Sequence, residues 1–114
     1  MNMKHEMKLH REPFEMIKSG IKTIELRLYD EKRRAISVGD EIEFMNAEGE
    51  KLLCEVKAMH IFDSFELLYR SLPLTECGYT EQDVQFASPD DMDVYYSKEK
   101  QRKYGVVGIG IKLI

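Results

Sequence analysis

The most informative part of the sequence is Gly20-Ile21-Lys22-Thr23-Ile24-Glu25-Leu26-Arg27. Its apolar residues Ile24 and Leu26 alternate with charged residues, which is the period of a half-buried strand. Glu25 and Arg27 therefore project together from the face opposite the apolar one. Lys22 stands at the strand start, where its long stem can swing toward either face. Spacing alone leaves two interpretations open: a solvated outer face, or a charged site.

A short helix precedes this strand. Pro13 suits the first helical position, Phe14 and Ile17 share a face, and Gly20 suits the position that follows a helix end. The sequence therefore predicts a helix of about two turns that leads directly into the charged strand.

A β-hairpin is predicted after the strand. Ile42 and Phe44 alternate with acidic residues, and Gly49 suits the positive φ of the turn. In the return strand, 51–61, one face is expected to carry Leu52, Cys54, Val56 and Ala58.

The second half is predicted to be helical before a last strand. Ser64 begins a helix that ends before Pro73, and further helices start within 80–83 and 88–91, the last running into Tyr104. The closing strand alternates apolar residues with Gly108 and Gly110, which permit a close backbone approach. We expect one shared core from residues on the apolar phase of their strands: Ile24, Leu26, Phe44, Val56, Ile109 and Ile111. The pattern predicts an α+β fold with a small, mostly antiparallel sheet or barrel and flanking short helices.

Composition limits the functional classes. The chain has 114 residues, which is one domain, and a net charge of -4 with a pI near 5.4, which argues against broad binding to polyanions. Cys54 and Cys77 are too few for a disulfide scaffold. No apolar run is long enough to cross a bilayer, and the first residues lack a signal-peptide core. We therefore expect a cytoplasmic protein with no membrane partner.

The charges are unevenly distributed. Residues 76–93 contain acidic residues without Lys or Arg, whereas 32–34 and 98–103 are mostly basic. Such runs are usually solvated surface. Tyrosines flank the second basic run, a mixture that stacks bases and holds phosphates. Of these tyrosines, Tyr104 is the more plausible ligand contact, while Tyr95 and Tyr96 are more often core residues.

Three motifs together resemble the ASCH domain family. They are the pattern Gly20-x-Lys22-x-x-Glu25-x-Arg27 after its helix, the turn and strand 38–44, and the closing strand 104–109. The resemblance covers nearly the whole chain, so it implies a single, stand-alone ASCH domain over 1–114. It further implies a β-barrel similar to the PUA domain.

The resemblance also implies a ligand. In this family a cleft between the barrel and the helix 13–19 is thought to bind RNA or a nucleotide-like small molecule, here through Lys22, Glu25 and Arg27. Lys and Arg can contact phosphate or base oxygens, and Glu can accept from an exocyclic amine. Thr23 and Tyr104 are the further candidate contacts.

One branch of the family is enzymatic and hydrolyses N4-acetylcytidine. This chain resembles that branch at Lys22, but Glu25 stands where the branch has a threonine nucleophile, and a carboxylate is a poor replacement. Thr23 is an adjacent stand-in, and Glu76 is the nearest candidate for the branch's catalytic glutamate. If the protein is an amidohydrolase, Lys22 and Glu25 would act as its general acid and base.

No other motif supports a cofactor or a metal. The His and Cys residues lack metal-ligand spacing, and the sequence has no phosphate-binding glycine loop or serine-esterase motif. Three hypotheses remain: a binding module for RNA or a nucleoside, an amidohydrolase, and a non-catalytic protein-interaction domain. A module predicts salt-sensitive RNA affinity, because phosphate contacts release counterions. An enzyme predicts turnover of a free nucleoside with little salt dependence.

Overall fold

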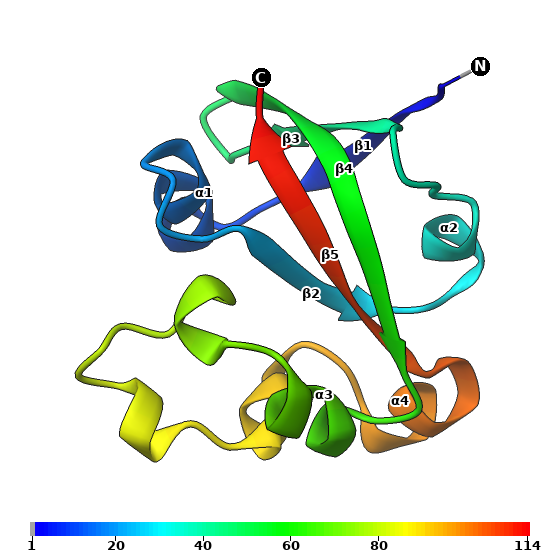
Figure 1. Cartoon of the computed structure of the whole chain (residues 1–114), viewed down its shortest axis with the longest axis vertical. Coiled ribbons are helices and arrows are strands. Elements are labelled where there is room, and N and C mark those ends of the chain that lie inside the picture. The colour runs from blue at the N-terminus through cyan, green and yellow to red at the C-terminus, as the bar shows by residue number, and fades with distance from the viewer. Residues whose placement is uncertain (1) are drawn as a thin grey trace.

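One curled sheet of five strands organises the molecule (Figure 1). The structure is a computed structural model and describes residues 2–114. Its strand order is β1-β3-β4-β5-β2, with β1 and β3 parallel and the other pairs antiparallel. The predicted α+β fold with a mostly antiparallel sheet is confirmed. The strands are β1 (Lys4–Lys8), β2 (Ile24–Leu28), β3 (Glu41–Met45), β4 (Lys51–Phe62) and β5 (Val106–Leu113).

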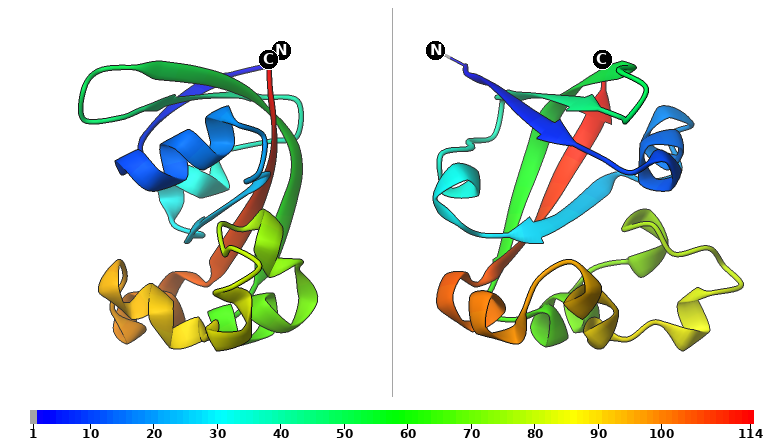
Figure 2. Two further views of the ribbon diagram at one scale, coloured as in Figure 1. Left: turned by 90° about the vertical axis from the view of Figure 1, so that its left-hand side faces the viewer. Right: turned by 180° about the vertical axis from the view of Figure 1, so that it is seen from behind.

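Short helices flank the sheet, as the sequence predicted. Helix α1 joins the edge strands β1 and β2, while α3, α4 and the 3-10 helices gather at one end of the sheet (Figure 2). The prediction that one helix runs from 88–91 into Tyr104 is wrong. The Ser97 side chain caps a separate helix, and that helix ends at Tyr104. The helices are α1 (Arg11–Lys18), α2 (Glu31–Arg34), α3 (Phe65–Ser71), α4 (Lys98–Tyr104), η1 (Leu74–Glu76), η2 (Val84–Phe86) and η3 (Pro89–Val94). None of the helices in residues 2–114 has the length and apolarity that a membrane crossing requires.

The apolar residues form two clusters instead of the single core predicted. The first fills the concave side of the sheet and includes Phe44, Val56 and Ile109. The second lies between β2 and the helical end, and it contains Ile24 and Leu26 with Phe65 and Leu68 of α3. All these side chains are buried, so the strand assignments hold while the shared core does not.

Strand register explains the division. Glu25 lies opposite Ile109 and Arg27 opposite Val107, so the charged face of β2 shares the concave side with the first cluster. The apolar face of β2 turns to the other side, above the glycines of β5. A Cβ at Gly110 would lie 3.4 Å from the backbone N of Ala58, which is the predicted close backbone approach, whereas at Gly108 the close neighbour is a side chain, with Leu72 Cδ1 at 2.6 Å.

A β-bulge changes the phase of β4. The register shifts between Val56 and Ala58, so Ala58 lies opposite Gly110 and Met59 opposite Ile109. Met59, and not Ala58, therefore packs against the first cluster. The prediction that Ala58 continues the face of Val56 is wrong.

Candidate functional site

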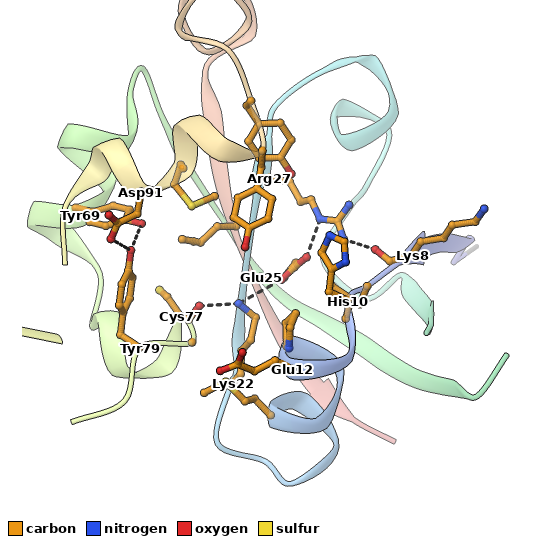
Figure 3. Close-up of a pocket in the computed structure, with 18 residues that line it drawn as sticks. Lys8, His10, Glu12, Lys22, Glu25, Arg27, Tyr69, Cys77, Tyr79 and Asp91 are labelled. Carbon is orange, nitrogen blue, oxygen red and sulfur yellow. Dashed lines mark hydrogen bonds and ion pairs between the residues drawn. The ribbon is translucent and has the colours of Figure 1, made fainter. Parts of the chain in front are cut away.

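Three charged side chains from the segment 22–27 meet in a buried cluster (Figure 3). Arg27 Nε donates to Glu25 Oε2 at 2.7 Å, and Lys22 Nζ lies 3.3 Å from Glu25 Oε1. Their side chains are 7% exposed for Lys22, 6% for Glu25 and 13% for Arg27. Of the two interpretations that spacing left open, the solvated outer face is therefore wrong. The face of β2 that carries Glu25 and Arg27 points into the concave side of the sheet.

The turn after α1 positions Lys22. The backbone N–H groups of Ile21 and Lys22 both donate to Met16 O, and Gly20 supports the turn at a φ of 84°. This turn directs the Lys22 side chain toward residues 77–78, where its Nζ donates to Cys77 O at 2.6 Å.

Gly78 makes room for the Lys22 amine. A Cβ at this position would lie 3.2 Å from Lys22 Nζ, and the backbone φ of 116° is one that other residues rarely adopt. Glycine therefore suits position 78 for two independent reasons, the space that the Lys22 amine needs and the positive φ.

Arg27 bridges the gap between the two edge strands. Its Nη2 donates to Lys8 O at 2.8 Å, so a β2 side chain reaches the end of β1. Backbone pairing does not join β1 to β2 in the described sheet. The Lys22–Glu25–Arg27 cluster thus lies at the open seam of the half-barrel.

A pocket of about 500 Å³ opens over this cluster. One side is formed by the β1–α1 junction, and the opposite side by α3, residues 77–79 and η3 (Figure 3). Its charged lining is balanced, with cations Lys8, Lys22 and Arg27 and anions Glu12, Glu25 and Asp91. The rest of the lining is aromatic, apolar or small: Leu9, His10, Pro13, Met16, Leu26, Tyr69, Cys77, Gly78, Tyr79, Met92, Tyr95 and Tyr96.

A hydrogen-bonded chain of hydroxyls forms the far wall. Tyr79 donates to Asp91 Oδ2 at 2.7 Å, and the Tyr69 and Tyr79 oxygens are 2.7 Å apart. Burial raises the pKa of both tyrosines, so both remain neutral at physiological pH. Burial likewise raises the pKa of the Cys77 thiol to about 11, which keeps it protonated and a weak nucleophile.

Of the predicted site residues, Lys22, Glu25 and Arg27 come together, whereas Thr23 and Tyr104 lie outside the pocket lining. Thr23 Oγ1 donates to Glu76 Oε1 at 2.7 Å, and Tyr104 packs against the second cluster. Within residues 2–114, no three His, Cys, Asp or Glu side chains gather as metal ligands would.

Sequence reasoning missed the opposite wall. Tyr69, Tyr79 and Asp91 come from separate segments of the second half, and their meeting depends on how those segments pack. The one local signal was Gly78, a glycine within the acidic stretch. His10, at the start of α1, carried no such signal.

The family model of the ASCH domain matches residues 7–114. The chain belongs to the ASCH domain family. No curated protein matches the chain.

Solved structures similar to this ASCH chain include two close relatives. The hypothetical protein PH0355 is 40% identical, with a TM-score of 0.81, over 98% of this chain and 100% of its own. Protein PF0455 from Pyrococcus furiosus is 39% identical, with a TM-score of 0.73, over 98% of each chain. The S128A mutant of ZmASCH from Zymomonas mobilis is 15% identical, with a TM-score of 0.65, over 96% of this chain and 67% of its own. This last similarity shows the fold alone, the PUA-like fold that the resemblance implied, here as a half-barrel.

Proposed function

We propose that this ASCH protein binds a nucleotide unit, of an RNA or of a free modified nucleoside, with its base in the pocket. The observation that carries the proposal is the buried Lys22–Glu25–Arg27 cluster at the base of a 500 Å³ cavity. Cavities of about 300–1,000 Å³ with a few fixed polar groups are typical of small-ligand sites.

The cluster retains hydrogen-bonding capacity toward a ligand. Lys22 has three N–H donors; one donates to Cys77 O, and the ammonium group also forms an ion pair with Glu25. Arg27 uses Nε and Nη2, and the described part of the chain offers Nη1 no hydrogen-bond partner. These donors suit the carbonyl oxygen of a base, and the carboxylates of Glu25 and Asp91 suit an exocyclic amine.

The aromatic lining suits a flat ring. Tyr95 is 60% exposed although it lines the pocket, and its ring centroid lies 6.3 Å from that of His10. Exposed tyrosine and histidine rings are common stacking partners of unpaired bases. Stacking and the polar cluster together would orient a base within the pocket.

The geometry favours binding over amide hydrolysis. Both carboxylate oxygens of Glu25 are engaged, Oε2 by Arg27 and Oε1 by Lys22, so an attack by Glu25 on an amide carbon would have to break these contacts. The Thr23 hydroxyl, the stand-in nucleophile, donates to Glu76 outside the pocket lining. We expect slow or no hydrolysis of N4-acetylcytidine. Turnover of about 1 per second or more, abolished in Glu25→Gln, would instead favour the amidohydrolase.

Calorimetric titration of the four common ribonucleosides and of N4-acetylcytidine tests the proposal. We expect at least one to bind, with Arg27→Ala weakening its affinity by about 5- to 150-fold, the range of a lost charge-assisted contact. Arg27→Lys, which keeps the charge beside Glu25, should fold normally and bind with intermediate affinity. Lys112→Ala, a surface cation of β5 outside the pocket, is the control and should bind like the wild type. No binding of any nucleoside would contradict the proposal and favour a protein-interaction domain.

A further inference from the structure

We propose that the segment 76–95 is a docking surface for a basic, partly apolar segment of a partner protein. Two of its side chains, Phe86 and Val94, are 76% and 80% exposed, more than any other large apolar side chain in residues 2–114. Neither of them lines the pocket. Their exposure is therefore not explained by the proposed nucleoside site, and this surface is a separate feature of the molecule.

The backbone holds these two side chains outward. Phe86 is the last residue of η2, and its N–H donates to Asp83 O at 2.9 Å. Val94 is the last residue of η3, whose start is capped by the Ser88 side chain. Met92 of η3 is buried in the second cluster, so the helix has an inward and an outward side. A surface fixed in this way costs little conformational entropy when a partner binds.

A third apolar side chain extends the exposed group. Tyr95 is 60% exposed and follows Val94 directly, so all three exposed side chains lie within 86–95. The stretch is at the end of the molecule that is remote from both chain termini (Figure 1). Single exposed apolar residues are normal on a protein surface, whereas a group of them among polar residues is typical of an interaction site.

The same segment concentrates negative charge. Six of the 21 acidic residues lie within 76–93, which has no Lys or Arg; without them the net charge of -4 would be +2. Among residues 2–114, Lys98 is the one cation that forms ion pairs with this stretch, on Asp90 and Asp93. Its negative charge is therefore only partly balanced.

The acidic hairpin 41–50 gives the contrast. Cations from other segments reach its carboxylates, with Lys4 Nζ 2.9 Å from Glu43 Oε2 and Lys18 Nζ 2.6 Å from Glu50 Oε2. The hairpin thus finds its counter-charges within the fold. The segment 76–95 leaves room for counter-charges from outside.

Charge and exposure together define the partner. A negative surface attracts Lys and Arg side chains, and it repels nucleic-acid phosphates and anionic lipids. Two copies that met through this surface would bring like charges together. A basic segment with apolar side chains would instead cover Phe86 and Val94 and pair with Glu81 and Asp83, which form no ion pair within residues 2–114.

Calorimetric titration with a synthetic amphipathic helix of leucine and lysine tests the proposal. We expect binding that weakens as salt rises from about 0.05 M to about 0.5 M, because salt screens exposed charges. Phe86→Ser/Val94→Ser should weaken binding by about 25-fold or more, about fivefold for each truncated contact. Melting temperature and nucleoside affinity should hardly change, because both side chains are exposed and outside the pocket.

The matched control is Val38→Ser/Ile114→Ser. These side chains are 62% and 69% exposed; Val38 precedes β3 and Ile114 is at the C-terminus, at the opposite end of the molecule (Figure 1). Their substitution should leave peptide binding nearly unchanged.

A second pair of variants tests the charge. Glu81→Gln/Asp83→Asn should weaken peptide binding at low salt by about fivefold and have little effect at high salt. Glu31→Gln/Glu48→Gln removes the same charge from exposed positions outside the segment and should have a smaller effect.

Three outcomes would overturn the docking surface: no binding of the lysine peptide, equal binding of a leucine and glutamate peptide, or equal losses in the Phe86/Val94 variant and its control. Sedimentation analysis adds a fourth. A wild type that dimerises, when Phe86→Ser/Val94→Ser does not, would assign the surface to a second copy instead. Nucleoside binding is titrated separately, so its failure would contradict the proposed function and leave the docking surface intact.

Discussion

Two buried carboxylates on this sheet have contrasting surroundings. Asp40, in the turn before β3, accepts hydrogen bonds from His5 Nε2 at 2.8 Å and from the backbone N–H groups of Ser37 and Met3 at 3.0 and 3.1 Å. These contacts join the N-terminal strand to the turn. The pocket lining includes neither Asp40 nor His5.

Glu25 is equally buried, but its partners are cations that also face a cavity. Lys22 and Arg27 both line the pocket, and each has a donor beyond those that the protein uses. A buried charge that the protein saturates acts on the fold alone, whereas a buried charge whose partners remain open to a cavity acts on a ligand as well.

The largest effect is expected from Glu25→Gln. The neutral amide would leave Lys22 and Arg27 buried without a counter-charge, which typically costs about 3–5 kcal/mol of folding stability. Urea denaturation measures this loss, and nucleoside titration should show that binding falls as well.

The control for this variant is Glu55→Gln. Glu55 forms an ion pair with Lys57 on exposed β4 surface, and its loss should cost less than about 1 kcal/mol. If Glu25→Gln were no more destabilising than this control, the buried cluster would not stabilise the fold.

A smaller effect is expected from Gly78→Ala. The φ of 116° makes any side chain strained, at about 1–2 kcal/mol of stability, and the new Cβ would push the Lys22 amine from its place. Nucleoside affinity should therefore fall together with stability, as calorimetry and thermal melting would measure.

Gly49→Ala separates these two causes. Gly49 also has a positive φ, 86°, but a Cβ there would meet no atom within 4 Å. We expect a similar loss of stability with unchanged nucleoside affinity. Equal affinity in both variants would show that the position of Lys22 does not matter for binding.

The sequence predicted strands β2 to β5, the helix before β2 and the cluster residues, because each depends on local alternation or on one short motif. It did not predict that Ile24 and Ile109 face different clusters, since strand register is set by pairing between distant segments. The burial of Glu25 follows from that same register. The wall formed by Tyr79 and Asp91 depends on the packing of irregular segments, which have no periodic pattern to interpret.

The smallest effect concerns Asp40 and acid. Hydrogen bonds from His5 and from the backbone hold the pKa of Asp40 at about 2, below the ordinary 3.8. Because the folded-state pKa is depressed, its stabilising contribution is present above about pH 4 and is lost as the pH falls toward 2. Thermal melting between pH 6 and pH 2 should show this loss in the wild type, and Asp40→Asn should be less stable at pH 6 and show a shallower decline.

Glu43, whose pKa is lowered by Lys4 at the surface, titrates in the same direction, so Glu43→Gln is the control. A decline in Asp40→Asn as steep as in the wild type would show that Asp40 does not link this part of the fold to pH. Nucleoside affinity of Asp40→Asn at pH 6 should match the wild type, since this carboxylate, unlike Glu25, acts on the fold alone.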